Sequence, residues 1–106
     1  SRLDLTSLVG NLFENAIRYN KVGGSISISL NRNTKEFKIS DTGIGIPKND
    51  IDHIFERFYR VDKARSRKLG GTGLGLAIVK HICLNYKIKI SVDSVLGQGS
   101  VFTLQF

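Results

Sequence analysis

Four stretches in which apolar residues recur at every second position constrain the fold of this chain most strongly. The four stretches are residues 25–30, 35–40, 87–92 and 101–106. Alternation of this kind is typical of half-buried strands, with one face toward the core and the other toward water. A short polar turn over residues 31–34 predicts that the first two strands form a hairpin. Because one face of each strand is polar, we expect a mixed, mostly antiparallel sheet with helices on a single face, which is a two-layer α+β sandwich.

Apolar residues at steps of three and four predict two helices. The first runs from near the start of the chain to about Tyr19, and a capping box of Ser1 and Asp4 is expected at its beginning. The second surrounds Cys83, which we expect to be a buried, inert thiol. Between the two helices, residues 51–59 are helical in part. These predictions rest on Leu5, Leu8, Val9, Leu12, Phe13, Ala16 and Ile17, on Ile54, Phe55 and Phe58, and on Leu76, Ala77, Ile78, Val79 and Ile82.

The length, charge and residue usage of the chain limit its possible functions. At 106 residues it has room for one domain, residues 1–106, with a single core. The sequence shows no apolar run near the length of a membrane span and no methionine, so we expect a domain excised from a longer protein. Its formal net charge of +7 suits a nucleic acid or an anionic ligand such as a nucleotide, and the placement of the charges has to decide between them.

A polar stripe borders the apolar face of the first helix. At about 100° per residue, Asn11, Asn15 and Arg18 fall on one side of the helix. The two asparagines can cap loops or hold a buried hydrogen bond. Alternatively, their amide oxygens can bind Mg²⁺, which takes few protein ligands and completes its shell with water and phosphate oxygens. In that interpretation Arg18 faces the phosphates and the ring of Tyr19 covers a base, whereas Glu14 is spaced to pair with Arg18 at the surface.

A second candidate segment is Asp41-Thr42-Gly43-Ile44-Gly45-Ile46-Pro47. Asp41 falls at the end of a predicted strand, where its carboxylate can point into a cleft. Gly43 and Gly45 would let the main chain approach a flat ligand, while the two isoleucines anchor the turn in the core. Pro47 suits the first turn of a helix. A turn that needs Asp and Gly only for its own geometry explains the same residues.

Positive charge gathers just before a cluster of glycines. Residues 60–68 carry five positive charges and one negative charge. Such a run can be a solvated loop, a nucleic-acid surface or a lid over a polyphosphate. Gly70-Gly71-Thr72-Gly73-Leu74-Gly75 follows and leads into the last predicted helix, whose free N–H groups favour an anion, so the lid is preferred. The cluster has neither the spacing of the dinucleotide fingerprint nor the Lys-Ser pair of the P-loop.

Four blocks in this order resemble the ATP-binding catalytic domain of sensor histidine kinases, within the wider group that includes type II topoisomerase ATPase subunits and mismatch-repair ATPases. Residues 11–19 look like the asparagine box of that family, 41–47 like its first glycine box, 55–60 like its phenylalanine box, and 71–75 like its second glycine box. The resemblance covers essentially the whole chain. It implies a Bergerat-type ATP-binding fold, with ATP and Mg²⁺ as cofactors.

The resemblance also implies roles for individual residues. Asn15, with Asn11 in support, would hold Mg²⁺ on the triphosphate. Asp41 would accept a hydrogen bond from the adenine amino group, and Tyr19 would stack on the adenine. Arg18 would contact phosphate where the family more often has lysine. The implied ATP-binding set is Asn11, Asn15, Arg18, Tyr19, Asp41, Gly43, Gly45, Ile46, Arg60, Lys63, Gly71, Thr72, Gly73, Leu74 and Gly75, with Asn15 and Asn11 as metal ligands and Arg60 and residues 63–68 in the lid.

No catalytic residue is expected in the chain itself. Hydrolysing members of the wider group have a glutamate where this sequence has Asn11, so phosphoryl transfer is favoured over hydrolysis. Neither His53 nor His81 has a phosphoacceptor context, and both are expected to be ordinary histidines. The resemblance implies an acceptor histidine on a separate dimerisation domain of the same kinase, a response regulator as the next acceptor, and a cytoplasmic location in a protein that other segments anchor in a membrane. Many relatives have a His-Gly-Gly turn after the last helix, and a remodelled link is expected from Leu84-Asn85-Tyr86-Lys87.

Three other functions compete with this one. A serine kinase that regulates sigma factors shares the fold and the ATP site, and differs in its protein substrate. Asp41-Thr42-Gly43 also matches the active-site triplet of aspartic proteases, but Ile44-Gly45 follows it and a long amphipathic helix opens the sequence. A non-enzymatic nucleic-acid-binding domain predicts salt-sensitive DNA binding without nucleotide dependence. We expect no nucleic-acid partner.

Overall fold

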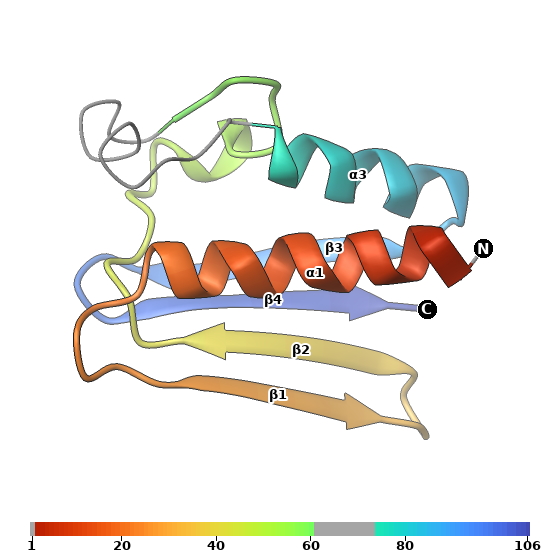
Figure 1. Ribbon diagram of the computed structural model, residues 1–106, viewed down its shortest axis with the longest axis horizontal. Coiled ribbons are helices and arrows are strands. Elements are labelled where there is room, and N and C mark those ends of the chain that lie inside the picture. Colours follow the sequence, from red (N-terminus) through yellow and green to blue (C-terminus); the bar gives the residue numbers. More distant parts are fainter. Residues whose placement is uncertain (1, 61–73) are drawn as a thin grey trace.

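A computed structural model describes residues 2–60 and 74–106, which form one sheet with helices on one of its faces (Figure 1). The elements are α1 (Arg2–Arg18), β1 (Ile26–Asn31), β2 (Glu36–Asp41), the 3₁₀ helix η1 (Ile51–His53), α3 (Gly75–Asn85), β3 (Lys89–Val95) and β4 (Gly99–Gln105). The sheet order is β1-β2-β4-β3, and every neighbouring pair is antiparallel. The predicted two-layer α+β fold is therefore confirmed, and the sheet is antiparallel throughout the described residues rather than mixed.

The predicted hairpin of β1 and β2 forms, and β3 and β4 form a second one. In the first, the side-chain oxygen of Asn31 accepts hydrogen bonds from the backbone N–H groups of Asn33 at 3.0 Å and Thr34 at 3.2 Å, which closes the polar turn. In the second, the turn after β3 contains Gly97 in the left-handed region, with φ of 83°. The register places the apolar residues of neighbouring strands opposite one another, so a single sheet face is apolar.

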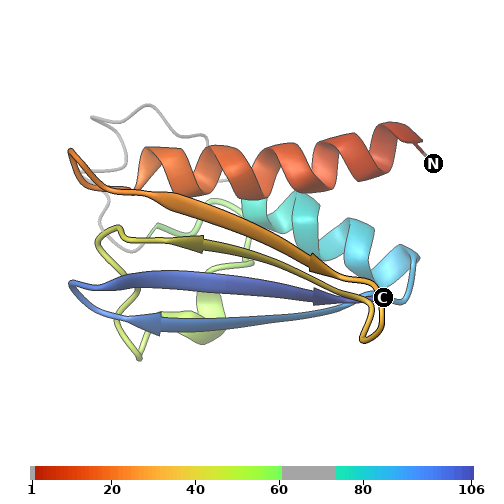
Figure 2. The ribbon, with the colours of Figure 1, turned by 90° about the horizontal axis from the view of Figure 1, so that it is seen from below.

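The core lies between that sheet face and the two helices, which lie side by side (Figure 2). Burial of these apolar side chains is the main force that holds the two layers together. Cys83 is buried among them, as predicted, and burial raises the pKa of its thiol. The buried set is Leu8, Leu12 and Ala16 of α1, Ile39 of β2, Ile54 directly after η1, then Val79, Ile82 and Cys83 of α3, and Phe102 and Leu104 of β4.

The prediction of one continuous apolar face on α1 is only partly correct. Leu8, Leu12 and Ala16 form a buried row, one residue per turn. The neighbouring row stays exposed and consists of Leu5, Val9, Phe13 and Ile17. The reason is tertiary, because α1 contacts α3 and β2 on one side only, and no described element covers the second row. The edge strand β1 is likewise exposed along most of its length.

Residues 47–60 are less helical than the sequence predicts. Only Ile51–His53 forms a helix, of the 3₁₀ type, and Pro47 begins a turn rather than a helix. Ile54 is buried and Phe55 packs against the core, as expected. The prediction that Phe58 is an apolar anchor is wrong, because this residue is 62% exposed. Two anchors hold this segment on the core, so its path does not depend on a continued helix.

The link after α3 is built without glycine. Lys87 has a φ of 57°, a conformation in which glycine is favoured, and the N–H of Ile88 then donates to the carbonyl of Cys83 at 2.8 Å. The hydroxyl of Tyr86 donates to the carboxylate of Asp4 at 2.6 Å, joining the end of α3 to the start of α1. The predicted capping partner Ser1 lies outside the described residues.

None of the helices in the described ranges is long and apolar enough to cross a membrane.

Candidate functional site

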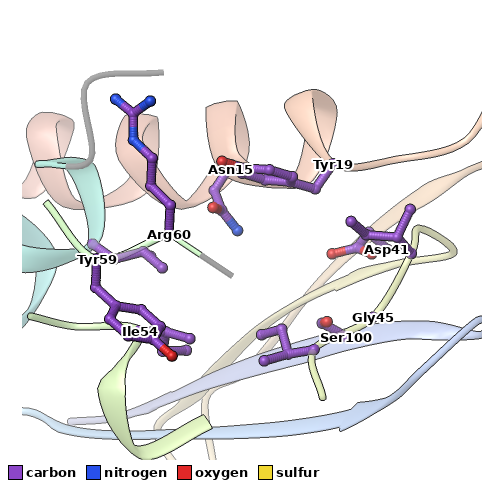
Figure 3. Close-up of a pocket in the computed structure, with 11 residues that line it drawn as sticks. Asn15, Tyr19, Asp41, Gly45, Ile54, Tyr59, Arg60 and Ser100 are labelled. Carbon is purple, nitrogen blue, oxygen red and sulfur yellow. The ribbon is translucent and has the colours of Figure 1, made fainter. Parts of the chain in front are cut away.

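Two adjoining cavities lie between the helices and the end of the sheet where β2 stops. Figure 3 shows residues that line the first of them. The first has a volume of about 90 Å³ and the second about 240 Å³. Six residues border both cavities, namely Asn15, Tyr19, Ile54, Tyr59, Arg60 and Leu76. The first cavity adds Asp41, Ile44, Gly45, Ile46 and Ser100, and the second adds Asn11, Glu14, Arg18, Gly75 and Ile78. The predicted carboxylate and the predicted amide stripe therefore meet in one site.

Asp41 forms the polar end of the first cavity. It is the last residue of β2, paired with Ser100 of β4, and its side chain lies half-buried at the cavity wall. Its carboxylate accepts a hydrogen bond from the N–H of Gly43 at 2.9 Å. Burial raises the pKa of Asp41, while hydrogen bonds from the backbone N–H groups of Gly43 and Ser100 lower it by a smaller amount. An ionised carboxylate in this position accepts hydrogen bonds and cannot donate them.

The glycines after Asp41 allow the chain to approach itself. A Cβ on Gly43 would lie 2.3 Å from the carbonyl oxygen of Tyr19, and one on Gly45 would lie 2.3 Å from that of Val95. Gly45 also has a φ of 74°. The expected approach to a ligand fits Gly45, which borders the first cavity. It does not fit Gly43, which is not among the described residues that line either cavity.

The two asparagines of α1 border the second cavity. The side-chain nitrogen of Asn11 donates to the carbonyl oxygen of Ser7 at 2.7 Å. That bond leaves the amide oxygen of Asn11 on the side of Gly75, 3.1 Å from where a Cβ on Gly75 would be. Amide oxygens are hard ligands of the kind that Mg²⁺ accepts, and Mg²⁺ needs only one or two of them when phosphate oxygens are present. The residues present therefore fit a magnesium ion carried by a phosphate ligand. In the described parts of the chain no group of three or more His, Cys, Asp or Glu side chains offers another metal site.

Arg18 borders the second cavity but is held by a neighbour. Its guanidinium pairs with the carboxylate of Glu14 at 2.8 Å, one turn earlier on α1. This is the surface pair that the spacing predicts, and it is exposed on the side of Glu14. Arg60, by contrast, reaches both cavities from the segment that precedes the undescribed residues 61–73.

Tyr59 is a site residue that the sequence did not point to. It borders both cavities, and its hydroxyl donates to the carboxylate of Asp50. This hydrogen bond raises the pKa of Tyr59. Its ring stacks on that of His53 at 5.4 Å between centroids, and His53 in turn contacts the carboxylate of Glu56 at 2.6 Å. The hydrogen bond to Glu56 raises the pKa of His53, which is otherwise an exposed histidine, as is His81 on α3.

Most of the predicted site residues that are described do come together. Asn11, Asn15, Arg18, Tyr19, Asp41, Gly45, Ile46, Arg60 and Gly75 border one or both cavities. Gly43 and Leu74 are described but are not among the lining residues. Lys63, Gly71, Thr72 and Gly73 lie outside the described residues, and so does the predicted lid apart from Arg60. Ser100, Leu76 and Tyr59 are among the lining residues that were not predicted, and Ser100 belongs to the polar end of the first cavity, because the pairing of β2 with β4 places it opposite Asp41.

Comparison with known proteins identifies the family. The sequence model of the family Histidine kinase-, DNA gyrase B-, and HSP90-like ATPase matches residues 1–106. The chain is 50% identical over 103 residues to Sensor histidine kinase RppB from Synechocystis sp., covering 95% of this chain and 23% of that protein. The chain thus spans about a quarter of the length of this curated relative.

Solved structures agree with this result. The structure of the mycobacterial sensor histidine kinase MprB has a TM-score of 0.85 and 32% identity, with 98% of this chain and 72% of that chain covered. The crystal structure of full-length ShkA in complex with AMPPNP has a TM-score of 0.74 and 29% identity, with 95% of this chain and 20% of that chain covered.

Proposed function

The chain belongs to the family of histidine kinase-, DNA gyrase B- and HSP90-like ATPases, and from this premise we propose that it binds Mg-ATP and positions the γ-phosphate for transfer to a histidine on a separate domain of a sensor kinase. One observation carries the proposal. The carboxylate of Asp41 and the amides of Asn11 and Asn15 border two adjoining cavities of a single site. A nucleotide has a base at one end, which needs a specific polar contact, and a charged triphosphate at the other, which needs Mg²⁺ or positive charge. The carboxylate suits the base, and the amides suit the magnesium ion on the triphosphate.

The first cavity suits adenine. Ile44, Ile54, Leu76 and Tyr19 line it. Apolar walls with one well-placed polar group are typical of cavities that bind a flat base. Asp41 supplies that polar group, and its carboxylate would accept a hydrogen bond from the adenine amino group. The similarity to ShkA, which was solved with the ATP analogue AMPPNP, supports a nucleotide in this fold.

The second cavity suits the phosphates. It is larger, and Asn11, Asn15, Arg18 and Gly75 border it. We propose that Asn15, supported by Asn11, holds Mg²⁺, which when bound would neutralise charge on the triphosphate. Arg60 and Arg18 add positive charge, and α3 begins at Gly75, which borders the same cavity, so a helix N-terminus favourable to anions lies there. Leu74 and the undescribed Lys63, Gly71, Thr72 and Gly73 are proposed to close over the phosphates.

The nucleophile is proposed to come from elsewhere in the full-length protein. Asn11 stands at the position where hydrolysing relatives are expected to have a glutamate, and amides do not act as bases, so transfer is favoured over hydrolysis. Residues 1–106 would work as one ATP-binding domain that lines up the γ-phosphate with a histidine of the dimerisation domain. A response regulator would receive the phosphoryl group next. Because ATP is a cytoplasmic metabolite, we place the domain in the cytoplasm, in a kinase that other segments anchor in the membrane.

Calorimetric titration tests nucleotide binding. ATP and ADP are expected to bind the domain, and Mg²⁺ is expected to strengthen ATP binding. Asp41→Asn turns part of the acceptor into a donor and should weaken ATP binding by at least roughly tenfold, the value of one hydrogen bond to a charged group. Asp93→Asn, at an exposed carboxylate of β3, is the matched control and should bind like the wild type. Absence of nucleotide binding by the folded wild-type domain would refute the proposal.

A second experiment tests the acceptor. The domain is mixed with the separate histidine domain of its own kinase and with ATP labelled on the γ-phosphate. Acid-labile phosphohistidine on that domain is expected. Acid-stable phosphoserine on a protein substrate would favour the alternative, a serine kinase of the type that regulates sigma factors.

A further inference from the structure

Three polar side chains form one row across three neighbouring strands beneath the first cavity. Asp41 of β2 is paired with Ser100 of β4, and Ser100 is paired with Ser94 of β3. Residues paired in this way lie on the same face of a sheet, so all three lie on the face that carries the cavity. Ser100 is 6% exposed and is a buried polar residue that borders the cavity. The role proposed above uses only Asp41.

The hydrogen bonds of Ser94 can be assigned by counting donors and acceptors. A serine hydroxyl has one hydrogen to donate and two lone pairs to accept with. The N–H of Ile46 lies 2.7 Å from the hydroxyl oxygen of Ser94 and can only donate, so it occupies one lone pair. The carbonyl oxygen of Gly99 lies 3.1 Å away and can only accept, so it takes the hydrogen. Ser94 therefore has one lone pair left.

This count decides the orientation of the Ser100 hydroxyl. The two serine oxygens are 2.8 Å apart, which is a hydrogen-bond distance. With the Ser94 hydrogen assigned to the carbonyl of Gly99, we assign Ser100 as the donor in this pair. The hydrogen of Ser100 then points toward Ser94 and away from the cavity. What Ser100 offers to the cavity is lone pairs only, beside the carboxylate of Asp41, which also only accepts.

We propose that Ser94 is a positioning residue that selects adenine over guanine by holding the Ser100 hydroxyl as an acceptor. Adenine carries an amino group at C6, which donates, whereas guanine carries a carbonyl oxygen there, which accepts. A cavity end with two acceptors, Asp41 and Ser100, favours the amino group and leaves the carbonyl of guanine facing lone pairs. The inference rests on the proposed function, because it assumes that the base lies at the Asp41 end.

The prediction concerns the ratio of two affinities. In Ser94→Ala the hydroxyl of Ser100 is free to turn and donate to the carbonyl of guanine. The affinity for GTP is then expected to rise relative to that for ATP, and the ratio of ATP to GTP affinity should fall by roughly tenfold, the value of one hydrogen bond gained or lost. Ser94→Thr keeps the hydroxyl and should restore the wild-type ratio. Calorimetric titration of the wild type and both variants with each nucleotide measures the ratio.

The ratio separates this role from a structural one. If Ser94 served only to hold the loop at Ile46, its loss would weaken ATP and GTP alike, and an unchanged ratio would overturn the inference. Ser100→Ala provides a second measurement should Ser94→Ala fail to fold. It removes the acceptor itself, so its ratio should also fall, and a wild-type ratio in Ser100→Ala would equally overturn the inference. If the wild type binds ATP but the ratios do not move, only this inference fails, whereas absence of ATP binding by the wild type contradicts the proposed function.

Discussion

At the scale of single residues, Asp41 combines a proposed binding role with a cost in stability. Its carboxylate is half-buried at the cavity wall, and burial raises its pKa above the ordinary value, despite the backbone hydrogen bonds that act in the opposite direction. A group with a raised carboxyl pKa is easier to ionise in the unfolded chain than in the folded one. The folded state therefore loses stability as the pH rises through the interval between the ordinary and the raised pKa, and the loss persists at neutral pH.

Asp41→Asn should accordingly be at least as stable as the wild type at pH 7, although it binds ATP poorly. The amide cannot ionise, so the variant lacks the loss of stability that the wild type suffers as Asp41 ionises. Urea denaturation between about pH 3 and pH 7 is the measurement, and the difference in free energy of unfolding should grow with pH in favour of the variant. Wild-type ATP affinity should in turn decline as the pH is lowered through the raised pKa. A variant that is much less stable than the wild type at pH 7 but equal to it at pH 3 would contradict this account.

At the scale of the elements, α1 has two apolar rows and only one of them is buried. Leu12 is 1% exposed and lies in the core, whereas its chain neighbour Phe13 is 40% exposed. The two positions share the same helix and nearly the same sequence context. They differ because α3 and β2 cover Leu12 and leave Phe13 exposed. The two positions therefore provide a matched comparison of a buried and an exposed apolar residue.

Leu12→Ala should cost about 2–5 kcal/mol of stability, because it removes buried apolar surface and leaves a cavity. Phe13→Ala should cost less than about 1 kcal/mol, because a large part of its ring is already in water. Urea denaturation of both variants measures the difference. Equal losses at the two positions would mean that the second row is covered in solution, since an exposed ring cannot contribute as much as a fully buried side chain.

The turn that ends α3 contains a residue with unfavourable backbone geometry. Lys87 adopts the left-handed conformation, which costs a residue with a Cβ about 1–2 kcal/mol and glycine almost nothing. Lys87→Gly is therefore expected to stabilise the domain by about 1 kcal/mol, seen as a higher denaturation midpoint. Lys89→Gly is the control. It changes the same residue type in the exposed part of β3, where glycine weakens a strand, so it should be neutral or destabilising.

At the scale of the whole molecule, the candidate site connects the layers. Its residues come from α1, β2, α3, β4 and the segment around Ile54. A ligand bound there contacts both the helices and the sheet, and it has no comparable site in the unfolded chain. Binding should therefore stabilise the folded domain as a unit.

Saturating Mg-ATP should raise the melting temperature by roughly 10 °C or more. A ligand at a hundred times its dissociation constant adds about 2.7 kcal/mol, and each kcal/mol is worth about 4–8 °C in a domain of this size. Differential scanning calorimetry with and without nucleotide is the measurement. Asp41→Asn, with roughly tenfold weaker binding, should show about half of the wild-type shift or less under the same conditions. A melting temperature that stays constant at high nucleotide concentrations would contradict nucleotide binding by the folded domain.

The local patterns of the sequence were sufficient for the elements and for most of the candidate site. Alternation identified all four strands, because a half-buried strand has a period of two whatever its partners are. The polar stripe of α1 and the acid at the end of β2 were recognisable for the same kind of reason, since each depends on a few neighbouring residues. The segment around Phe58 was predicted less well, because its apolar spacing is compatible with a helix and packing of Ile54 and Phe55 made a continued helix unnecessary.

Apart from the first hairpin, which its turn predicts, the tertiary structure decided which elements are neighbours and what depends on it. Helical periodicity placed Leu12 and Phe13 on one face, but only the positions of α3 and β2 decide which of them is buried. No local pattern connects Asp41, Ser94 and Ser100, and they form one row because β4 lies between β2 and β3 in the sheet. The physical reason is that short-range periodicity reports the shape of one element, whereas burial and hydrogen bonding between distant residues depend on how the elements pack together.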